Sequence, residues 1–199
     1  MIVANYQKKQ TVTKLQKVFS TFSQAINRSI ADNGPIDEWY SSETQNNAIN
    51  YFNTYFKPYL QVTPCSSYSE CGYTKSRPWS YSNNTVYDWY LSGTNQTRDF
   101  FHLNDGVFVA IKTGHGGASD GWWAYDENAT IIIDLNGGKG PNKFGRDVFV
   151  AQAVNDKGLV PACYDKTENY VKSMCIGTGS CCLRKIIQDS WEIKDDYPW

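Results

Sequence analysis

Apolar residues in the first stretch of the chain, from Ala4 to Ala31, recur at intervals of three and four. That spacing stacks them along one side of a helix. The apolar stripe consists of Leu15, Val18, Phe19, Phe22, Ala25, Ile26 and Ile30. Gly34-Pro35 follows as a stop signal. The pattern predicts a helix roughly 40 Å long, which would act as the spine of the domain.

The next segment changes from a helical pattern to an irregular one. A second amphipathic helix is predicted from Thr44 to Lys57, and Pro58 ends it. Residues 61–99 show no clear period and are predicted as a loop, with a short strand near residues 86–91. Loops of this length are uncommon in compact domains, so we expect a disulfide to hold this one.

Alternation with a period of two begins near Phe101. Phe101–Leu103 and Val107–Ile111 flank Asn104-Asp105-Gly106, and Asp-Gly is a strong hairpin signal. Thr130–Leu135 is predicted as a third strand buried on both faces, and Val148–Ala151 as a fourth. Helices followed by antiparallel strands predict an α+β fold, with the long helix packed on a roughly four-stranded sheet.

Composition indicates a folded chain without a strong global charge. Hydrophobic residues make up 41% of the 199 residues, and 19 basic and 20 acidic residues leave a net charge of −1. This balance does not favour a nucleic-acid partner. The length fits a single domain over 1–199. Within it, we expect the spine at 1–31, the sheet at 100–155 and a disulfide-tied C-terminal region at 160–199.

Six cysteines accompany only two histidines, and no paired arms with zinc spacing occur. We therefore expect disulfides and an oxidising compartment. Cys65 and Cys71 flank a short polar loop and are expected to pair. Adjacent Cys181 and Cys182 cannot bond to each other without strain. Each must therefore pair with Cys163 or Cys175, which leaves two connectivities open.

No constellation in the sequence indicates catalysis. His102 and His115 have no patterned nucleophile beside them, the G-x-S-x-G motif is absent, and Asp195-Asp196 is interpreted as a solvated pair. We therefore predict that the protein is not an enzyme. Trp122-Trp123 could form a sugar platform, although core tryptophans are commoner.

The segment 134–147 contains the sharpest local motif. Alternating Asp and Asn oxygens before glycines are typical of the start of a calcium loop. The candidate ligands are Asp134, Asn136 and Asp147. No closing glutamate follows, and Lys139 brings the wrong charge, so the alternative is a glycine-rich turn held by Asx side chains.

Lysines and asparagines supply weaker signals. The lysines of the first helix are interpreted as a solvated face rather than a phosphate-binding surface; they are Lys8, Lys9, Lys14 and Lys17. Asparagines that begin N-x-Ser/Thr sequons are interpreted as chance matches in an Asn-rich chain; they are Asn27, Asn83, Asn95 and Asn128.

Three groups of motifs, in this order, resemble type IV pilin-like proteins and type II secretion pseudopilins. The first is Ile2-Val3-Ala4-Asn5-Tyr6-Gln7-Lys8-Lys9-Gln10, which is similar to the point where an apolar membrane helix continues into its amphipathic half. The second joins Leu103–Gly106 to residues 132–149 with Gly140-Pro141-Asn142 and Gly145-Arg146-Asp147. The third is Cys182–Asp189, predicted as a short helix, with Asp195–Trp199.

The resemblance implies a structural subunit of a pilus, a secretion pseudopilus or a DNA-uptake filament. Its partners would be other pilin-like subunits, met through the N-terminal helix. The resemblance also implies a leader and an apolar half-helix ahead of Ile2, an inner-membrane-anchored precursor, and then a place in the periplasm or in a cell-surface filament. We accordingly expect this chain to be the domain that lacks the membrane half-helix. The alternative is a secreted carbohydrate- or ligand-binding module that uses its aromatic loops.

Two finer expectations depend on the same resemblance. Major pseudopilins carry calcium in a strand–strand loop, which favours the calcium interpretation of Asp134, Asn136 and Asp147; no other cofactor is expected. Cys182 lies at the family-like C-x-x-Lys-Ile-Ile position, and Gly177-Thr178-Gly179 could form a tight loop. We therefore choose Cys175–Cys182 with Cys163–Cys181 over the other connectivity.

Overall fold

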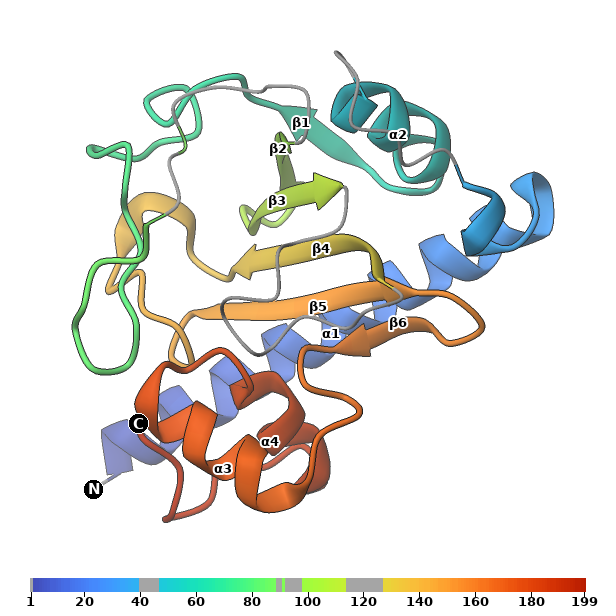
Figure 1. Cartoon of the computed structure of the whole chain (residues 1–199). Coiled ribbons are helices and arrows are strands. Elements are labelled where there is room, and N and C mark those ends of the chain that lie inside the picture. The colour runs from blue at the N-terminus through green and yellow to red at the C-terminus, as the bar shows by residue number, and fades with distance from the viewer. Residues whose placement is uncertain (1, 40–46, 89–90, 92–97, 114–126) are drawn as a thin grey trace.

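The computed structural model describes residues 2–39, 47–88, 91, 98–113 and 127–199. Its longest element is helix α1, Ile2–Asn33, with 32 residues and hence a length of roughly 48 Å. Figure 1 shows α1 crossing one face of a sheet, with the N-terminus and the C-terminus at the same end of the molecule.

The amphipathic pattern of the first segment is confirmed. Leu15, Phe22 and Ile26 are fully buried, and Val18 is 1% exposed. Gly34 closes the helix, with a positive φ of 81° and an N–H that donates to the Ile30 carbonyl at 3.0 Å. A glycine adopts this left-handed conformation without steric cost.

The sheet has six antiparallel strands in the order β1-β2-β3-β4-β5-β6. Their bounds are β1 Val62–Pro64, β2 Arg98–Leu103, β3 Phe108–Thr113, β4 Glu127–Asp134, β5 Val148–Val154 and β6 Gly158–Pro161. Each strand pairs with the next one along the chain, so the sheet is a simple meander (Figure 1).

The prediction of four strands over 100–155 missed both edges of the sheet. β1 has three residues and β6 has four, and each ends in a proline. Runs this short give no measurable alternation, and proline is typical of an edge strand because it cannot donate to a ladder. The predicted strand near residues 86–91 is present only as an isolated bridge between Ser80 and Val86; residues 89, 90 and 92–97 lie outside the described part.

Alternating side chains of the sheet enter two hydrophobic cores. On the face covered by α1, Ile131 and Ile133 join the core that also contains Leu15 and Phe22. On the opposite face, Ile132 joins a second core built with Phe108, Trp79 and other residues of the 65–91 segment. Burial of β4 on both faces, predicted from its three consecutive isoleucines, is therefore confirmed.

Three shorter helices in the described part of the chain pack around the sheet and its two cores. They are α2 Asn47–Tyr55, α3 Glu168–Gly177 and α4 Cys182–Gln188, with 3₁₀ turns η1 Ile36–Glu38, η2 Lys57–Tyr59 and η4 Gly137–Lys139. The second helix ends at Tyr55, two residues before the predicted end, and η2 contains the terminating Pro58. Its predicted start at residues 44–46 lies outside the described residues. The last helix agrees with its prediction to within one residue.

Three disulfides tie the chain together: Cys65–Cys71, Cys163–Cys181 and Cys175–Cys182. This is the connectivity chosen in the sequence analysis. The last two bonds join the segment after β6 and helix α3 to the start of α4. Three buried disulfides indicate an oxidising, extracytoplasmic compartment. Among the described residues, no helix combines the length and apolarity that crossing a membrane requires.

Candidate functional site

The N-terminal end of α1 projects beyond the cores. Among the helix side chains described, which begin at Asn5, the first buried one is Val12, whereas Asn5, Tyr6 and Gln7 are exposed, with Tyr6 at 62%. Opposite this end lies the C-terminal tail, where Trp191 and Ile193 line a groove of about 510 Å³ together with Lys8 and other residues of α1. The exposed side chains of Asn5, Tyr6 and Gln7 are thus accessible for contacts outside the domain.

Two of the four lysines predicted to form a solvated face on α1, Lys9 and Lys17, are exposed, and Lys8 is half-buried. Lys17 also forms an exposed ion pair with Asp105 at 3.1 Å. Lys14 is half-buried, and its Nζ donates to the Leu135 carbonyl at the end of β4. Lys14 and Lys17 therefore attach α1 to the hairpin tip and to the loop after β4.

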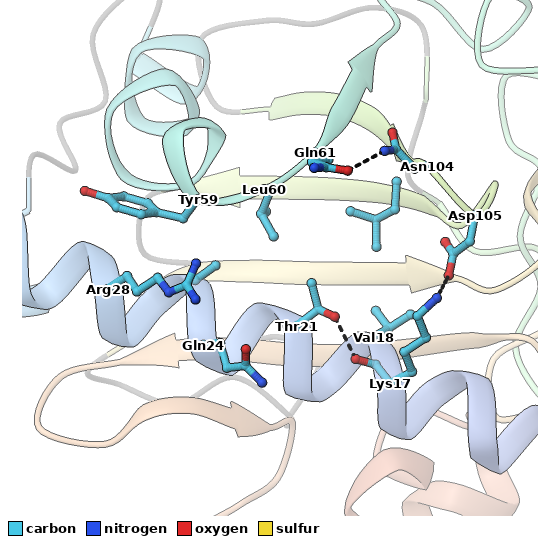
Figure 2. Close-up of a pocket in the computed structure, with 12 residues that line it drawn as sticks. Lys17, Val18, Thr21, Gln24, Arg28, Tyr59, Leu60, Gln61, Asn104 and Asp105 are labelled. Atoms are coloured by element: carbon cyan, nitrogen blue, oxygen red, sulfur yellow. Dashed lines mark hydrogen bonds and ion pairs between the residues drawn. The ribbon is translucent and has the colours of Figure 1, made fainter.

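A second groove runs along the middle of α1 and has a volume of about 450 Å³. One wall is a polar stripe of the helix, and the other comes from Tyr59, Gln61 and the β2–β3 turn (Figure 2). Side chains at intervals of four, three and four residues form that stripe, since this spacing repeats one helical face; they are Lys17, Thr21, Gln24 and Arg28. We refer to this feature as the α1 groove.

The loop after β4 brings together the residues predicted to bind calcium. Asp134 ends β4 and lies opposite Val148, the first residue of β5. The backbone N–H of Asn136 donates to Asp134 Oδ1 at 3.3 Å. The N–H of Leu135 donates to the backbone carbonyl of Asp147 at 2.8 Å. Strand pairing thus brings Asp134, Asn136 and Asp147 close to one another.

Asp134 is fully buried and is held by two aromatic donors from the 65–91 segment. The Tyr73 hydroxyl donates to Asp134 Oδ2 at 2.7 Å, and the Trp79 indole N–H donates to the same oxygen at 3.0 Å. The two rings also contact each other edge to face, with centroids 6.3 Å apart. The loop carrying the first disulfide is therefore attached to the sheet by a polar network inside the second core.

Asp147 is held by backbone donors of its own loop. The N–H of Lys143 donates to Oδ1 at 2.7 Å, and the N–H of Asn142 donates to Oδ2 at 2.8 Å. Asn136 donates its Nδ2 to the Gly140 carbonyl at 2.7 Å. Its Oδ1 is buried, and no hydrogen-bond donor in the described part of the chain reaches it.

Asp134 and Asp147 both have pKa values raised above that of an ordinary aspartate. Burial, and next the nearby charge of Asp147, raise the pKa of Asp134 to about 7. Burial also raises the pKa of Asp147, against the opposing hydrogen bonds from Lys143 and Asn142. The pKa of the Tyr73 hydroxyl is raised by burial and by Asp134, so Tyr73 remains a donor. Two neighbouring buried carboxyls need a shared proton or a cation to lower their repulsion.

The residues present fit a calcium ion. Each carboxylate can accept about four hydrogen bonds or metal contacts in all, and the known donors leave oxygen lone pairs unused. The buried Oδ1 of Asn136 supplies a further neutral oxygen, and calcium takes oxygen ligands of these kinds. No cluster of three or more His, Cys, Asp or Glu side chains is arranged for a metal among the described residues, so amide and carbonyl oxygens would have to complete the shell.

Other predicted features lie in structural positions. His102 is half-buried on β2, with Nε2 3.2 Å from the Cys71 carbonyl. Asp195 and Asp196 are exposed, and Asp196 also forms ion pairs with Lys172 and Lys185. His115 and Trp122-Trp123 lie outside the described residues.

Two sequons have described side chains. Asn27 is exposed within α1, and Asn83 is exposed in the 81–85 loop, where its Oδ1 accepts from the N–H of Thr85 at 2.9 Å. Asn95 lies outside the described residues, as does the side chain of Asn128.

Sequence reasoning missed the α1 groove and the partners of Asp134. The polar stripe of α1 has the same three-and-four spacing as its apolar stripe, so half of the groove could have been found. Tyr73 and Trp79 lie 61 and 55 residues before Asp134. No local pattern marks either aromatic residue as a partner of that carboxylate.

Comparison with known proteins identifies the family of this chain. Residues 1–199 match the sequence profile of a family described as "Family of unknown function (DUF6613)", and the chain therefore belongs to that family. No curated protein matches the chain, and no solved structure does.

Proposed function

We propose that this protein is a pilin-like or pseudopilin-like structural subunit of a filament outside the cytoplasm. The observation that carries the proposal is α1. It is a 32-residue helix whose rear two-thirds is packed on an antiparallel sheet, while none of its described side chains from Asn5 to Thr11 is buried. This is the arrangement that the sequence resemblance implies for a subunit that meets its neighbours through its first helix.

The rest of the molecule supports a structural role. Three disulfides and two cores fix the sheet and the C-terminal region as a rigid body. In the proposed mechanism, the projecting end of α1 contacts other subunits, and the sheet with its loops forms the outer surface. The residues described here have no role in chemical conversion under this proposal, and the protein is not an enzyme.

Burial of three aromatic residues counts against a sugar site at their positions; Tyr68 and Tyr81 are half-buried, and Trp122-Trp123 lies outside the described residues. Tyr73, Trp79 and Tyr87 of the 61–99 segment are between 1% and 7% exposed and line the second core. Stacking on a sugar requires an accessible ring face, and these three rings are packed in the second core instead. They are therefore unavailable to a sugar, which favours the structural role.

A calcium ion at Asp134, Asn136 and Asp147 would complement this role. We propose these three residues as its side-chain ligands. The ion would neutralise the two buried carboxylates and fix the loop between β4 and β5. It would act on stability alone.

Immunogold electron microscopy tests the proposed function. Antibodies raised against the 199-residue domain are applied to the source organism, with a strain deleted for the gene as the control. Gold on filaments or in the cell envelope is expected. Gold throughout the cytoplasm, or protein found only as free monomer in the medium, would contradict the proposal.

A further inference from the structure

The α1 groove has the dimensions of a binding site for an extended chain. Its helical wall spans Lys17 to Arg28, a separation of 11 residues and therefore about 16 Å along the axis. An extended peptide advances about 3.3 Å per residue, so the groove has room for about five residues. Figure 2 shows that the groove is bounded by α1 on one side and by the entry to β1 and the β2–β3 turn on the other.

The floor of the groove is apolar and its rims are polar. Val18, Leu60 and Leu103, each at most 9% exposed, lie at the bottom. Side-chain amides stand on both walls: Gln24 on the helix, where its Nε2 donates to Ser20 Oγ at 3.2 Å, and Gln61 on the far wall. The Oε1 of Gln61 accepts from Asn104 Nδ2 at 2.7 Å, which fixes the orientation of that wall. These contacts leave the Oε1 of Gln24 as an acceptor and the Nε2 of Gln61 as a donor for the peptide groups of an extended segment.

Charge at the two ends of the groove is not balanced. Lys17 at one end is neutralised by Asp105, with Nζ and Oδ2 3.1 Å apart. Arg28 at the other end forms no ion pair with any described residue, and Figure 2 shows its side chain extending from α1 toward the Tyr59–Leu60 wall. The guanidinium group presents planar donors that match a carboxylate. The groove therefore has one cation available to a ligand.

We propose that the α1 groove binds an extended acidic peptide segment of a partner protein, with an Asp or Glu carboxylate on Arg28. The proposal concerns a second surface and does not depend on subunit contacts through the front of α1. Apolar or small side chains of the bound segment lie over Val18 and Leu103. Its peptide groups meet the amides of Gln24 and Gln61.

The lining of the groove favours a peptide over an acidic sugar. Tyr59 is the one aromatic residue among the lining residues in the described part of the chain. Its hydroxyl is already engaged, donating to Asp32 Oδ2 at 2.9 Å and accepting from Asn33 Nδ2 at 3.0 Å. Sugar sites in proteins depend on aromatic rings that offer a free face. Apart from Tyr59, the groove is lined by amide, aliphatic and charged side chains, which suit a peptide better.

Titration of the ¹⁵N-labelled domain, followed by NMR, tests this site with three probes. They are acetyl-Ala-Ser-Asp-Ser-Ala-amide, the same peptide with Asn in place of Asp, and trigalacturonate. We expect the Asp peptide to give saturable shifts at the amides of Thr21, Gln24 and Gln61 and the Asn peptide to bind about tenfold more weakly. That ratio reflects the loss of one charge-assisted hydrogen bond.

Two variants separate the groove from general charge effects. Arg28→Gln should weaken binding of the Asp peptide about tenfold, so that the domain no longer prefers it over the Asn peptide. Lys9→Gln makes an equal change of charge at an exposed position of α1 outside the groove lining. It should leave the affinities for both peptides unchanged. Well-dispersed spectra verify that each variant is folded.

Several outcomes would overturn the proposal. They are the absence of saturable shifts, equal binding of the two peptides, indifference to Arg28→Gln, or trigalacturonate binding in place of the Asp peptide. Failure of this test leaves the filament proposal unaffected, because that one is decided in cells by the antibody labelling.

Discussion

At the scale of single residues, the buried Asp134 controls how stability responds to pH. Its pKa is about 7 in the folded protein, because burial and the charge of Asp147 disfavour the carboxylate, whereas an ordinary aspartate has a pKa of about 4. Between these values the folded state holds a proton that the unfolded state has released. Stability therefore falls as pH rises from about 4 to 7. Asp99, whose pKa burial raises to about 6, acts in the same direction.

We predict that without calcium the free energy of unfolding decreases between pH 5 and pH 7. Each additional proton held by the folded state contributes about 1.4 kcal/mol per pH unit. Asp134→Asn should flatten this slope, since an amide does not titrate. Urea denaturation across the pH range measures the slope, and Asp88→Asn, at an exposed aspartate, is the matched control. An equally steep slope in Asp134→Asn would show that other groups cause the dependence.

A bound calcium ion should reduce the repulsion between the carboxylates of Asp134 and Asp147. We predict that millimolar Ca²⁺ raises the melting temperature at pH 7.5, because a ligand that binds only the folded state stabilises it by about 2.7 kcal/mol at 100 times its dissociation constant. Asp134→Ala should abolish the rise, and Asn136→Ala should reduce it. Differential scanning calorimetry with Mg²⁺ as the control decides the matter. A melting temperature that Ca²⁺ leaves unchanged would leave the Asx-held turn as the interpretation of this loop.

At the scale of elements, the junction between α3 and α4 depends on one close backbone approach. Gly179 has a positive φ of 83°, and a Cβ atom on it would lie 2.3 Å from the Phe144 carbonyl oxygen. The loop before β5 and the start of α4 can therefore pack together only when this position has no side chain. Cys181 and Cys182 follow directly, so the same junction positions two of the disulfides.

We predict that Gly179→Ala destabilises the protein by about 2 kcal/mol or more, from the disfavoured φ and the forced displacement of Phe144. Gly177 is the matched control, since a Cβ there meets no atom within 4 Å and its φ is not positive. Gly177→Ala at the end of α3 should be neutral or slightly stabilising. Thermal denaturation of both variants tests this, and equal melting temperatures would contradict it.

How far the sequence predicted each element depended on the number of buried positions it contains. α1 and β4 were predicted because each repeats its apolar period over several turns or residues. Helix α3 was not, because only Val171 and Cys175 of its ten residues are buried, and two positions do not define a period. Its N-cap Thr167, whose side chain accepts from the N–H of Tyr170, was the available signal.

In the candidate sites, contacts between segments distant in sequence could not be predicted. The loop at 134–147 was identified because its acidic and amide residues are close in sequence. Its aromatic donors and the far wall of the α1 groove come from segments more than 30 residues away, brought together only by the tertiary fold. Side-chain chemistry was therefore predictable within a loop, and its partners across the fold were not.

At the scale of the whole molecule, the proposed filament subunit would meet its neighbours through the projecting end of α1. The most direct measurement is photo-crosslinking in the source organism, with p-benzoylphenylalanine placed at Tyr6, which is 62% exposed at that end. Val86, 55% exposed on the side of the second core, is the matched control. A ladder at multiples of the subunit mass from position 6, with none from position 86, is the predicted result. Monomer alone from position 6, or the same pattern from both positions, would contradict the proposed filament subunit.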